Sequence, residues 1–180
     1  MVCAVFFDIN ILEKRKIRFD HVFAPGNIDF FSDDLKQVGD LRAVGEAEML
    51  DPSGAREIRV RGDVQGEMEV CCARCLSPTR VGVSSALDLY YRPMSEIARN
   101  EEEVAISEAE TEIGFYEGGG LELADVIREQ IMIQLPMRSI CREDCKGICP
   151  ICGGNRNFED CRCQEHFSDP RWEALRKWKF

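Results

Sequence analysis

The sequence predicts an α+β protein, in which a bent or barrel-like antiparallel sheet is covered by one helix and followed by a cysteine-rich C-terminal module. Three patterns favour this fold class. Apolar and polar residues alternate over long stretches between Leu41 and Tyr91, which is typical of half-buried strands. Apolar residues recur at four-residue steps through residues 121–135, which indicates an amphipathic helix. Six of the ten cysteines lie between Pro136 and Cys163.

The overall composition is that of an ordinary globular protein, because 44% of the 180 residues are hydrophobic and 31% are charged. No basic region precedes the first apolar residues, and no apolar run approaches the roughly 18 residues that a membrane helix needs. We therefore expect a cytoplasmic protein without membrane contact. Thiols stay reduced in that compartment, so ten cysteines indicate metal binding or catalysis rather than disulfides.

The formal net charge of −10 is unevenly distributed along the chain. Residues 138–180 contain nine Lys and Arg against seven Asp and Glu, whereas residues 1–137 contain 14 against 26. Nucleic acid repels a globally acidic protein unless the charges of that protein are segregated. We expect an α+β domain at 1–137 and a cysteine-rich module with a C-terminal helix at 138–180. Only the second part is basic enough to face a polyanion.

Three strands are expected in the middle of the chain. Residues 41–49 alternate as a half-buried strand, and residues 58–72 continue with the longest alternation in the sequence. Because fifteen residues is long for one flat strand, we expect a bend or a bulge at Gly62 or Gly66. The chain reverses at residues 77–79 and returns as a third alternating strand, so that the last two strands form a hairpin.

The same alternation indicates which cysteines meet at the tip of this hairpin. Only Cys72 shares the apolar parity of its strand, whereas Cys71 has the polar parity and is expected to face outward. We therefore pair Cys72 with Cys75 as one half of a tetrahedral metal site. A redox dithiol more naturally lies where a strand enters a helix, so the hairpin disfavours that interpretation.

An acidic segment near residues 93–120 follows the hairpin. Ten acidic residues and one basic residue lie between Ser95 and Asp125. Such a composition is typical of a solvated loop, and its functional alternative is an acidic arm that docks on a basic partner. A short strand at 113–116 closes the segment, and the amphipathic helix that comes next must end at Pro136.

Eight cysteines form four close pairs, which suffice for two tetrahedral sites of four thiolates. The grouping that we prefer joins the hairpin pair to the first C-terminal pair and leaves the last two pairs as a self-contained module, although interleaved groupings stay open. Four thiolates favour structural Zn²⁺, with one ion expected in each site, and iron–sulfur ligation would use the same donors. The two sets are Cys72, Cys75, Cys141 and Cys145, and Cys149, Cys152, Cys161 and Cys163.

The sequence contains no phosphate loop, no dinucleotide-binding fingerprint and no His-Glu-x-x-His motif, and it has only two histidines. Four thiolates around an ion also leave no open position at which water could be activated. We therefore expect a protein that is not an enzyme and takes no small-molecule substrate. A thiol–disulfide redox protein is the enzymatic alternative. At the C-terminus, Asp169 and Pro170 predict the start of a short helix that carries Trp172 and Trp178.

With these motifs assembled, the chain resembles the YceD family, whose founding member is described as a large ribosomal RNA subunit accumulation protein. The resemblance rests on five features in a fixed order that span about residues 41–175. They are C-x-R-C-L at Cys72–Leu76, the Leu-rich helix ending in Leu135–Pro136, C-K-G-x-C-P-x-C-G at Cys145–Gly153, C-x-C at Cys161–Cys163, and Asp169–Pro170–Arg171.

The resemblance implies a non-enzymatic role in 23S ribosomal RNA accumulation or processing, and hence in assembly of the large ribosomal subunit. The expected partners are 23S ribosomal RNA or its precursor, a basic ribosomal protein, or both. A zinc-stapled adaptor that binds protein without touching RNA is the alternative. The basic positions that we expect to contact phosphates are Arg138, Arg142, Lys146, Arg156, Arg162 and Arg171.

Overall fold

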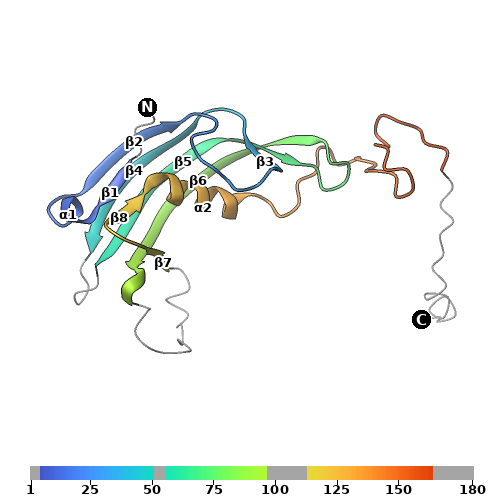
Figure 1. Cartoon of the computed structure of the whole chain (residues 1–180). Helices are drawn as coiled ribbons and strands as arrows, with labels where there is room; N and C mark the ends of the chain where they lie inside the picture. The colour runs from blue at the N-terminus through green and yellow to red at the C-terminus, as the bar shows by residue number, and fades with distance from the viewer. Residues whose placement is uncertain (1–4, 51–55, 97–112, 164–180) are drawn as a thin grey trace, which may run out of the picture.

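Figure 1 shows the computed structural model of the chain, which describes residues 5–50, 56–96 and 113–163. A curved sheet forms one end of an elongated molecule, and the cysteine-rich segment extends beyond the far end of the longest hairpin. Arg171, the predicted C-terminal helix and much of the acidic segment lie outside the described residues. The elements are β1 (Phe6–Asp8), α1 (Ile9–Leu12), β2 (Ile17–Phe23), β3 (Leu35–Gln37), β4 (Leu41–Leu50), β5 (Glu57–Cys71), β6 (Pro78–Pro93), the 3-10 turn η1 (Met94–Glu96), β7 (Ile113–Tyr116), β8 (Gly120–Glu122) and α2 (Leu123–Gln134).

The main sheet has the strand order β2-β4-β5-β6-β7, with β3 paired to β5, while β1 and β8 form a separate two-stranded sheet. The protein is thus mostly sheet with a small helical part. Within the described residues β2 and β7 do not pair, so the sheet is not a closed barrel, contrary to the barrel-like alternative. The prediction of an antiparallel sheet is also wrong at one edge of the sheet, because β7 runs parallel to β6.

The hairpin of β5 and β6 follows the predicted alternation closely. Pairing runs without a break from Ile58↔Tyr91 to Cys71↔Pro78. Val60, Val64 and Met68 are fully buried on one face of β5, as the parity of the sequence indicates. The predicted strands and their reversal are therefore confirmed, and the hairpin carries its tip well past the rest of the sheet (Figure 1).

Of the two features expected at Gly62 or Gly66, a bend or a bulge, the bulge is absent, because the register of β5 is unbroken against both β4 and β6. The strands instead curve smoothly (Figure 1). Gly62 lies opposite Gly45 of β4, and a Cβ atom on Gly45 would collide with the backbone of Arg61 and lie 2.8 Å from the Cα atom of Gly62. Two strands without side chains at this point approach closely, which accommodates the curvature without an inserted residue.

Helix α2 contributes its buried side chains to the same core as the sheet. The Gln130 amide donates a buried hydrogen bond of 2.9 Å to the Ser85 hydroxyl of β6, and the Tyr91 hydroxyl donates to Glu129 at 3.2 Å. Ile133 is 75% exposed, so the apolar stripe is narrower than the sequence suggests. These contacts place α2 beside β6; the wider prediction that the helix covers the sheet stays a prediction. No helix among the described residues is long and apolar enough to cross a membrane.

On the outer face of the sheet, basic and acidic side chains form ion pairs between neighbouring strands. Arg59 of β5 makes a bidentate pair with Asp88 of β6, with distances of 2.7 and 2.8 Å, and Arg42 pairs with Asp20 at 2.8 Å. Arg61 reaches Glu46 at 2.9 Å. Exposed pairs of this kind contribute little to stability, but they neutralise the charges of Arg42, Arg59 and Arg61.

Because β4 and β5 approach closely at Gly62, we expect two glycine substitutions to differ in their effect on the free energy of unfolding. Gly62→Ala places a Cβ atom 2.7 Å from the Cα atom of Gly45, where only backbone can yield, and should lower the free energy of unfolding by about 1–3 kcal/mol. Gly82→Ala is the control, since nothing lies within 4 Å of its added Cβ atom, and it should change stability by less than about 0.5 kcal/mol. Urea denaturation measures both, and equal losses would contradict this explanation.

Candidate metal centres

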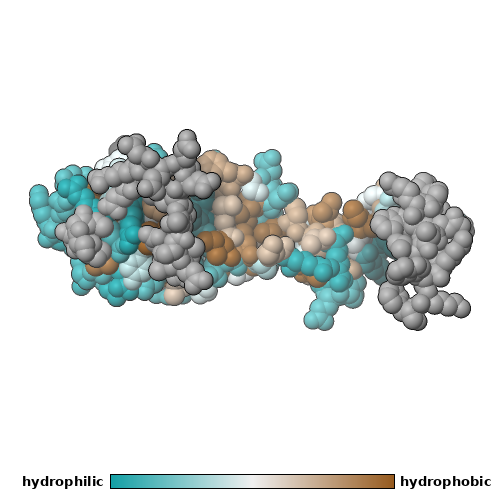
Figure 2. Space-filling view, turned by 90° about the horizontal axis from the view of Figure 1, so that it is seen from below, coloured by the Kyte–Doolittle hydropathy of each residue, from teal (hydrophilic) through white to brown (hydrophobic). Residues whose placement is uncertain are grey.

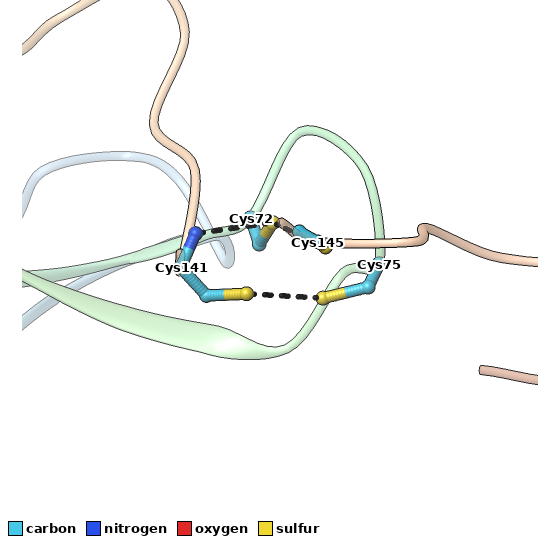
Figure 3. Close-up of side chains that lie close together, drawn as sticks. All are labelled: Cys72, Cys75, Cys141 and Cys145. Carbon is cyan, nitrogen blue, oxygen red and sulfur yellow. Dashed lines mark hydrogen bonds between the residues drawn. The ribbon is translucent and has the colours of Figure 1, made fainter. Parts of the chain in front are cut away.

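The first cysteine cluster forms where the hairpin tip meets the segment after α2. Cys72 and Cys75 come from the tip, and Cys141 and Cys145 come from the segment that follows the helix. Their sulfur atoms all lie within 4.8 Å of one another, and Figure 3 shows the four side chains turned inward. The Cys72 and Cys145 sulfurs are 3.9 Å apart, and those of Cys75 and Cys141 are 3.6 Å apart. Cys72 is fully buried.

Backbone hydrogen bonds close the hairpin tip around this cluster. The Leu76 N–H donates to the Cys72 carbonyl and the Cys72 N–H donates to the Ser77 carbonyl, both at 2.9 Å. Leu76 adopts a left-handed conformation with φ of 60°, which costs energy for a leucine and shows that the surrounding bonds dictate the turn. The tip is therefore a tight loop that aims two sulfurs at one point.

Arg74 fastens the C-terminal segment to the tip. Its guanidinium donates to the carbonyls of Glu143 and Cys145, each at 3.1 Å, while its own carbonyl accepts from the Ile148 N–H at 2.9 Å. The neighbouring Ala73 N–H donates to the Ser139 carbonyl at 2.8 Å. These contacts fix the two halves of the first cluster independently of the sulfur atoms.

The thiols of the first cluster differ in pKa, which is lowered for Cys72 and Cys75 and raised for Cys141. The Cys72 sulfur accepts from the N–H groups of Cys141, at 3.4 Å, and Arg74, at 3.5 Å, and these bonds lower its pKa to about 6. The Ser77 hydroxyl lowers the pKa of Cys75 in the same way. Desolvation, followed by the adjoining sulfurs, raises the pKa of Cys141 to about 12. A thiolate already present at neutral pH makes the cluster attractive to a cation.

The second cluster is built from the knuckle at Cys149 and Cys152 together with Cys161 and Cys163, whose sulfurs also lie within 4.8 Å. Its turn is closed by the Gly153 N–H, which donates to the Cys149 carbonyl at 2.9 Å, with Gly153 at φ of 74°. The N–H groups of Cys152 and Ile151 lower the pKa of Cys149 to about 6. A hydrogen bond with the Cys152 sulfur raises the pKa of Cys163 to about 12.

The spacing of these sulfurs suits a tetrahedral ion. Zinc–sulfur bonds of about 2.3 Å in a tetrahedron place neighbouring sulfurs about 3.8 Å apart, and the two distances in the first cluster, 3.9 and 3.6 Å, lie on either side of that value. Each of the two clusters could thus hold one metal ion. The sets of four are those that the spacing of the sequence favours, and the interleaved groupings do not occur.

Cys71 lies outside both clusters, as its parity predicts. Its exposed sulfur is 3.7 Å from a carboxylate oxygen of Asp34. The predicted phosphate contacts in the described part of the module are all on the surface, although Arg142 is engaged by Asp144 at 3.3 Å. These exposed residues are Arg138, Arg142, Lys146, Arg156 and Arg162.

Sequence reasoning missed three residues that organise the clusters. Arg74 is visible in the sequence only as the middle of C-x-R-C, and the spacing of the cysteines assigns no role to residues 154–158. In the structure Asn155 donates to the Ser77 hydroxyl at 3.1 Å, and Asn157 donates to the Cys145 sulfur at 3.4 Å. Two asparagines two residues apart beside a metal knuckle were the available signal.

Comparison with known proteins gives one family and several relatives. A family model described as "Large ribosomal RNA subunit accumulation protein YceD" matches residues 60–179. Relatives described as uncharacterised proteins in Mycobacterium tuberculosis H37Rv and Mycobacterium bovis are each 32% identical over 142 residues, which is 76% of this chain and 65% of the relative. A Mycobacterium leprae relative is 29% identical over 124 residues, covering 68% of this chain and 54% of its own length. The chain thus spans less than two thirds of these relatives, and no solved structure matches it.

The two clusters predict how metal content responds to single substitutions. The unchanged chain should bind two metal ions, and Cys72→Ser or Cys149→Ser should each bind one, because a tetrahedral site that loses a thiolate binds far more weakly. Cys71→Ser removes an adjacent thiol that belongs to neither cluster and should keep both ions. Elemental analysis of the purified chains measures this. A loss of metal in Cys71→Ser, or none in Cys72→Ser, would count against the assignment.

Proposed function

The chain belongs to the YceD family, and from that premise we propose that it is a non-enzymatic factor for 23S ribosomal RNA accumulation and large-subunit assembly, which binds ribosomal RNA through its cysteine-rich module. The family description supports the role in accumulation of the large ribosomal RNA. Residues 138–180 form the proposed RNA-binding module, and the hairpin tip at Cys72 and Cys75 serves as its anchor. Such a factor acts where ribosomes assemble, in the cytoplasm.

We further propose that each cluster holds a structural Zn²⁺ ion. Zinc accepts four thiolates in a tetrahedron without redox change, which suits a site that only fixes the chain. An iron–sulfur cluster interposes several atoms between its cysteines, so sulfurs within 4.8 Å of one another favour a single ion. Four thiolates engaged by an ion also leave no free pair for thiol–disulfide exchange.

The observation that carries the RNA proposal is the contrast between the paired basic side chains of β4 and β5 and three basic side chains of the module that take part in no ion pair among the described residues. On the sheet, Arg42, Arg59 and Arg61 are each paired with a carboxylate. In the module, Arg138, Lys146 and Arg162 are exposed, and none of the ion pairs among the described residues involves them. Cations without an internal partner are the ones that gain most from a phosphate.

Neutralising these three cations tests the proposal. The triple variant Arg138→Gln, Lys146→Gln, Arg162→Gln should bind a transcribed 23S ribosomal RNA precursor more weakly. The slope of the logarithm of the association constant against the logarithm of the salt concentration should also become less negative by about two to three. Each lost phosphate contact removes about 0.7–0.9 from the size of that slope. Fluorescence anisotropy over a salt series measures both quantities.

A matched variant controls for the change in net charge. Lys14→Gln, Arg15→Gln, Arg18→Gln also removes three positive charges, from exposed positions in the turn after α1 and in β2. Its salt slope should equal that of the unchanged chain, because these side chains lie away from the module. Equal slopes for both triple variants would place the RNA surface elsewhere or remove it altogether.

A protein-binding adaptor is the second candidate function, and one surface favours it. Met132, Ile133 and Met137 at the end of α2 are 50%, 75% and 106% exposed, and apolar side chains gather around the helix and its connection to the module (Figure 2). Exposed apolar patches of this kind mark protein interaction sites. The basic charge of a ribosomal protein would complement the acidic balance of residues 1–137, and an apolar surface on that protein would pack against the patch.

Removing the apolar patch separates the adaptor from the RNA-binding factor. Met132→Ser, Ile133→Ser should abolish capture of purified large-subunit proteins if the adaptor proposal holds, and it should leave RNA affinity and its salt slope unchanged. Ile11→Ser on α1 is the control, since it removes a side chain of similar exposure, 42%, at a distant position. Protein capture that survives in the double variant argues against an adaptor surface on α2.

A further inference from the structure

The loop of the second cluster reaches across to the first cluster through one asparagine. Asn157 lies in the chain between Cys152 and Cys161, yet its amide nitrogen donates to the Cys145 sulfur at 3.4 Å. Its amide oxygen accepts from the Lys146 N–H at 2.9 Å and from the Arg142 guanidinium at 2.8 Å. Two donors on the oxygen fix the orientation of the amide, so its nitrogen must point at the sulfur.

The rest of the loop docks on the hairpin in the same way. Asn155 holds the Asn157 side chain with an oxygen 2.8 Å from the amide nitrogen, and its own nitrogen donates to the Ser77 hydroxyl at 3.1 Å and the Cys75 carbonyl at 3.4 Å. The Arg156 N–H donates to the Gly147 carbonyl at 2.9 Å. Three successive residues of the second loop thus contact the frame of the first cluster.

The first cluster accepts a hydrogen bond from the loop of the second cluster, and the second cluster accepts its hydrogen bonds from its own knuckle. The N–H groups that donate to the Cys149 sulfur belong to Ile151 and Cys152, which lie in the same knuckle. Among the described residues, no hydrogen bond joins a side chain of the first cluster to a sulfur of the second. The first cluster depends on a donor supplied by the second, and the second supplies its own donors.

We propose that Asn157 is a positioning residue of the first metal site, and that a metal ion in the second site strengthens metal binding in the first by holding Asn157 against the Cys145 sulfur. This inference rests on the proposed metal function. An ion bound by Cys152 and Cys161 closes the loop that carries Asn157 and restricts its motion. Hydrogen bonds from outer residues orient metal ligands, and their removal typically costs 10–100-fold in metal affinity. The first site should therefore bind its ion more weakly when the second site is empty.

Metal release from the full chain tests the proposal. The protein is loaded with Zn²⁺ and release to excess chelator is followed by colour; Cys149→Ser and Cys72→Ser each keep one site and so assign the two phases. Asn157→Asp keeps the acceptor for Lys146 and Arg142 but turns the donor toward Cys145 into an oxygen. It should accelerate release from the first site about ten-fold or more and leave the second phase unchanged.

Coupling predicts a further, non-additive pattern. Cys149→Ser should accelerate release from the first site to a similar degree, because the freed loop no longer presents Asn157, and adding Asn157→Asp should then change little. Cys72→Ser should leave release from the second site at its normal rate. In the Co²⁺-loaded chain, Asn157→Asp should move the sulfur-to-metal band of the first site to longer wavelength, since a sulfur without its hydrogen bond gives up electron density more easily.

Two variants test whether the effects come from the Asn157 side chain or from a general loss of structure in the module. Phe158→Ala changes the next residue of the loop, whose ring is 80% exposed, and should leave both release rates and the cobalt spectrum unchanged. Asn157→Ala should reproduce the effects of Asn157→Asp without adding a charge. The coupling is wrong if both phases accelerate equally in Asn157→Asp, or if Cys149→Ser releases metal from its first site at the normal rate. A wild-type chain that binds no metal would instead overturn the proposed metal function itself, together with this inference.

Discussion

The unbroken pairing of β5 with β6 is the constraint on which the rest of the molecule depends. Pairing that holds from Ile58↔Tyr91 to Cys71↔Pro78 preserves the parity of side chains along the whole hairpin. Because one slip would exchange the two faces, the register decides that Cys72 turns inward and Cys71 outward. The long hairpin also projects its tip beyond the sheet, so that the cysteine segment gathers there rather than against the core (Figure 1).

The two cysteine clusters lie in a part of the chain that has few apolar side chains to bury. The core cluster of the sheet contains 23 buried residues, whereas the apolar cluster at the hairpin tip consists of Cys72, Cys75 and Cys145 with Ile140 packed against them. Hydrophobic burial alone stabilises so small a unit weakly, and metal ions in the two clusters would compensate for the missing core. Arg74 and Asn155 complement the sulfurs, because they join the hairpin tip to the segment after α2 through a main-chain carbonyl and a hydroxyl.

The distribution of charge follows from the same division. Opposite charges on neighbouring strands of the sheet satisfy one another, since residues directly across a strand pair lie within reach. In the module Arg142 pairs with Asp144, but none of the ion pairs among the described residues involves Arg138, Lys146 or Arg162, which are exposed. An acidic chain can in this way carry a local surface for a polyanion without attracting it over its whole length.

Much of this protein was determined by its sequence alone. The alternation through residues 41–91, the helix that ends before Leu135 and Pro136, and the pairing of cysteines by short spacing all report local periodicity, which one segment carries by itself. Only the tertiary structure decided that β7 lies parallel to β6, that Gly45 meets Gly62 without a bulge, and that Asn157 reaches the Cys145 sulfur. These features join segments far apart in the chain. Local patterns indicate which face of a segment is buried, but the partner of that face depends on how all the segments pack together.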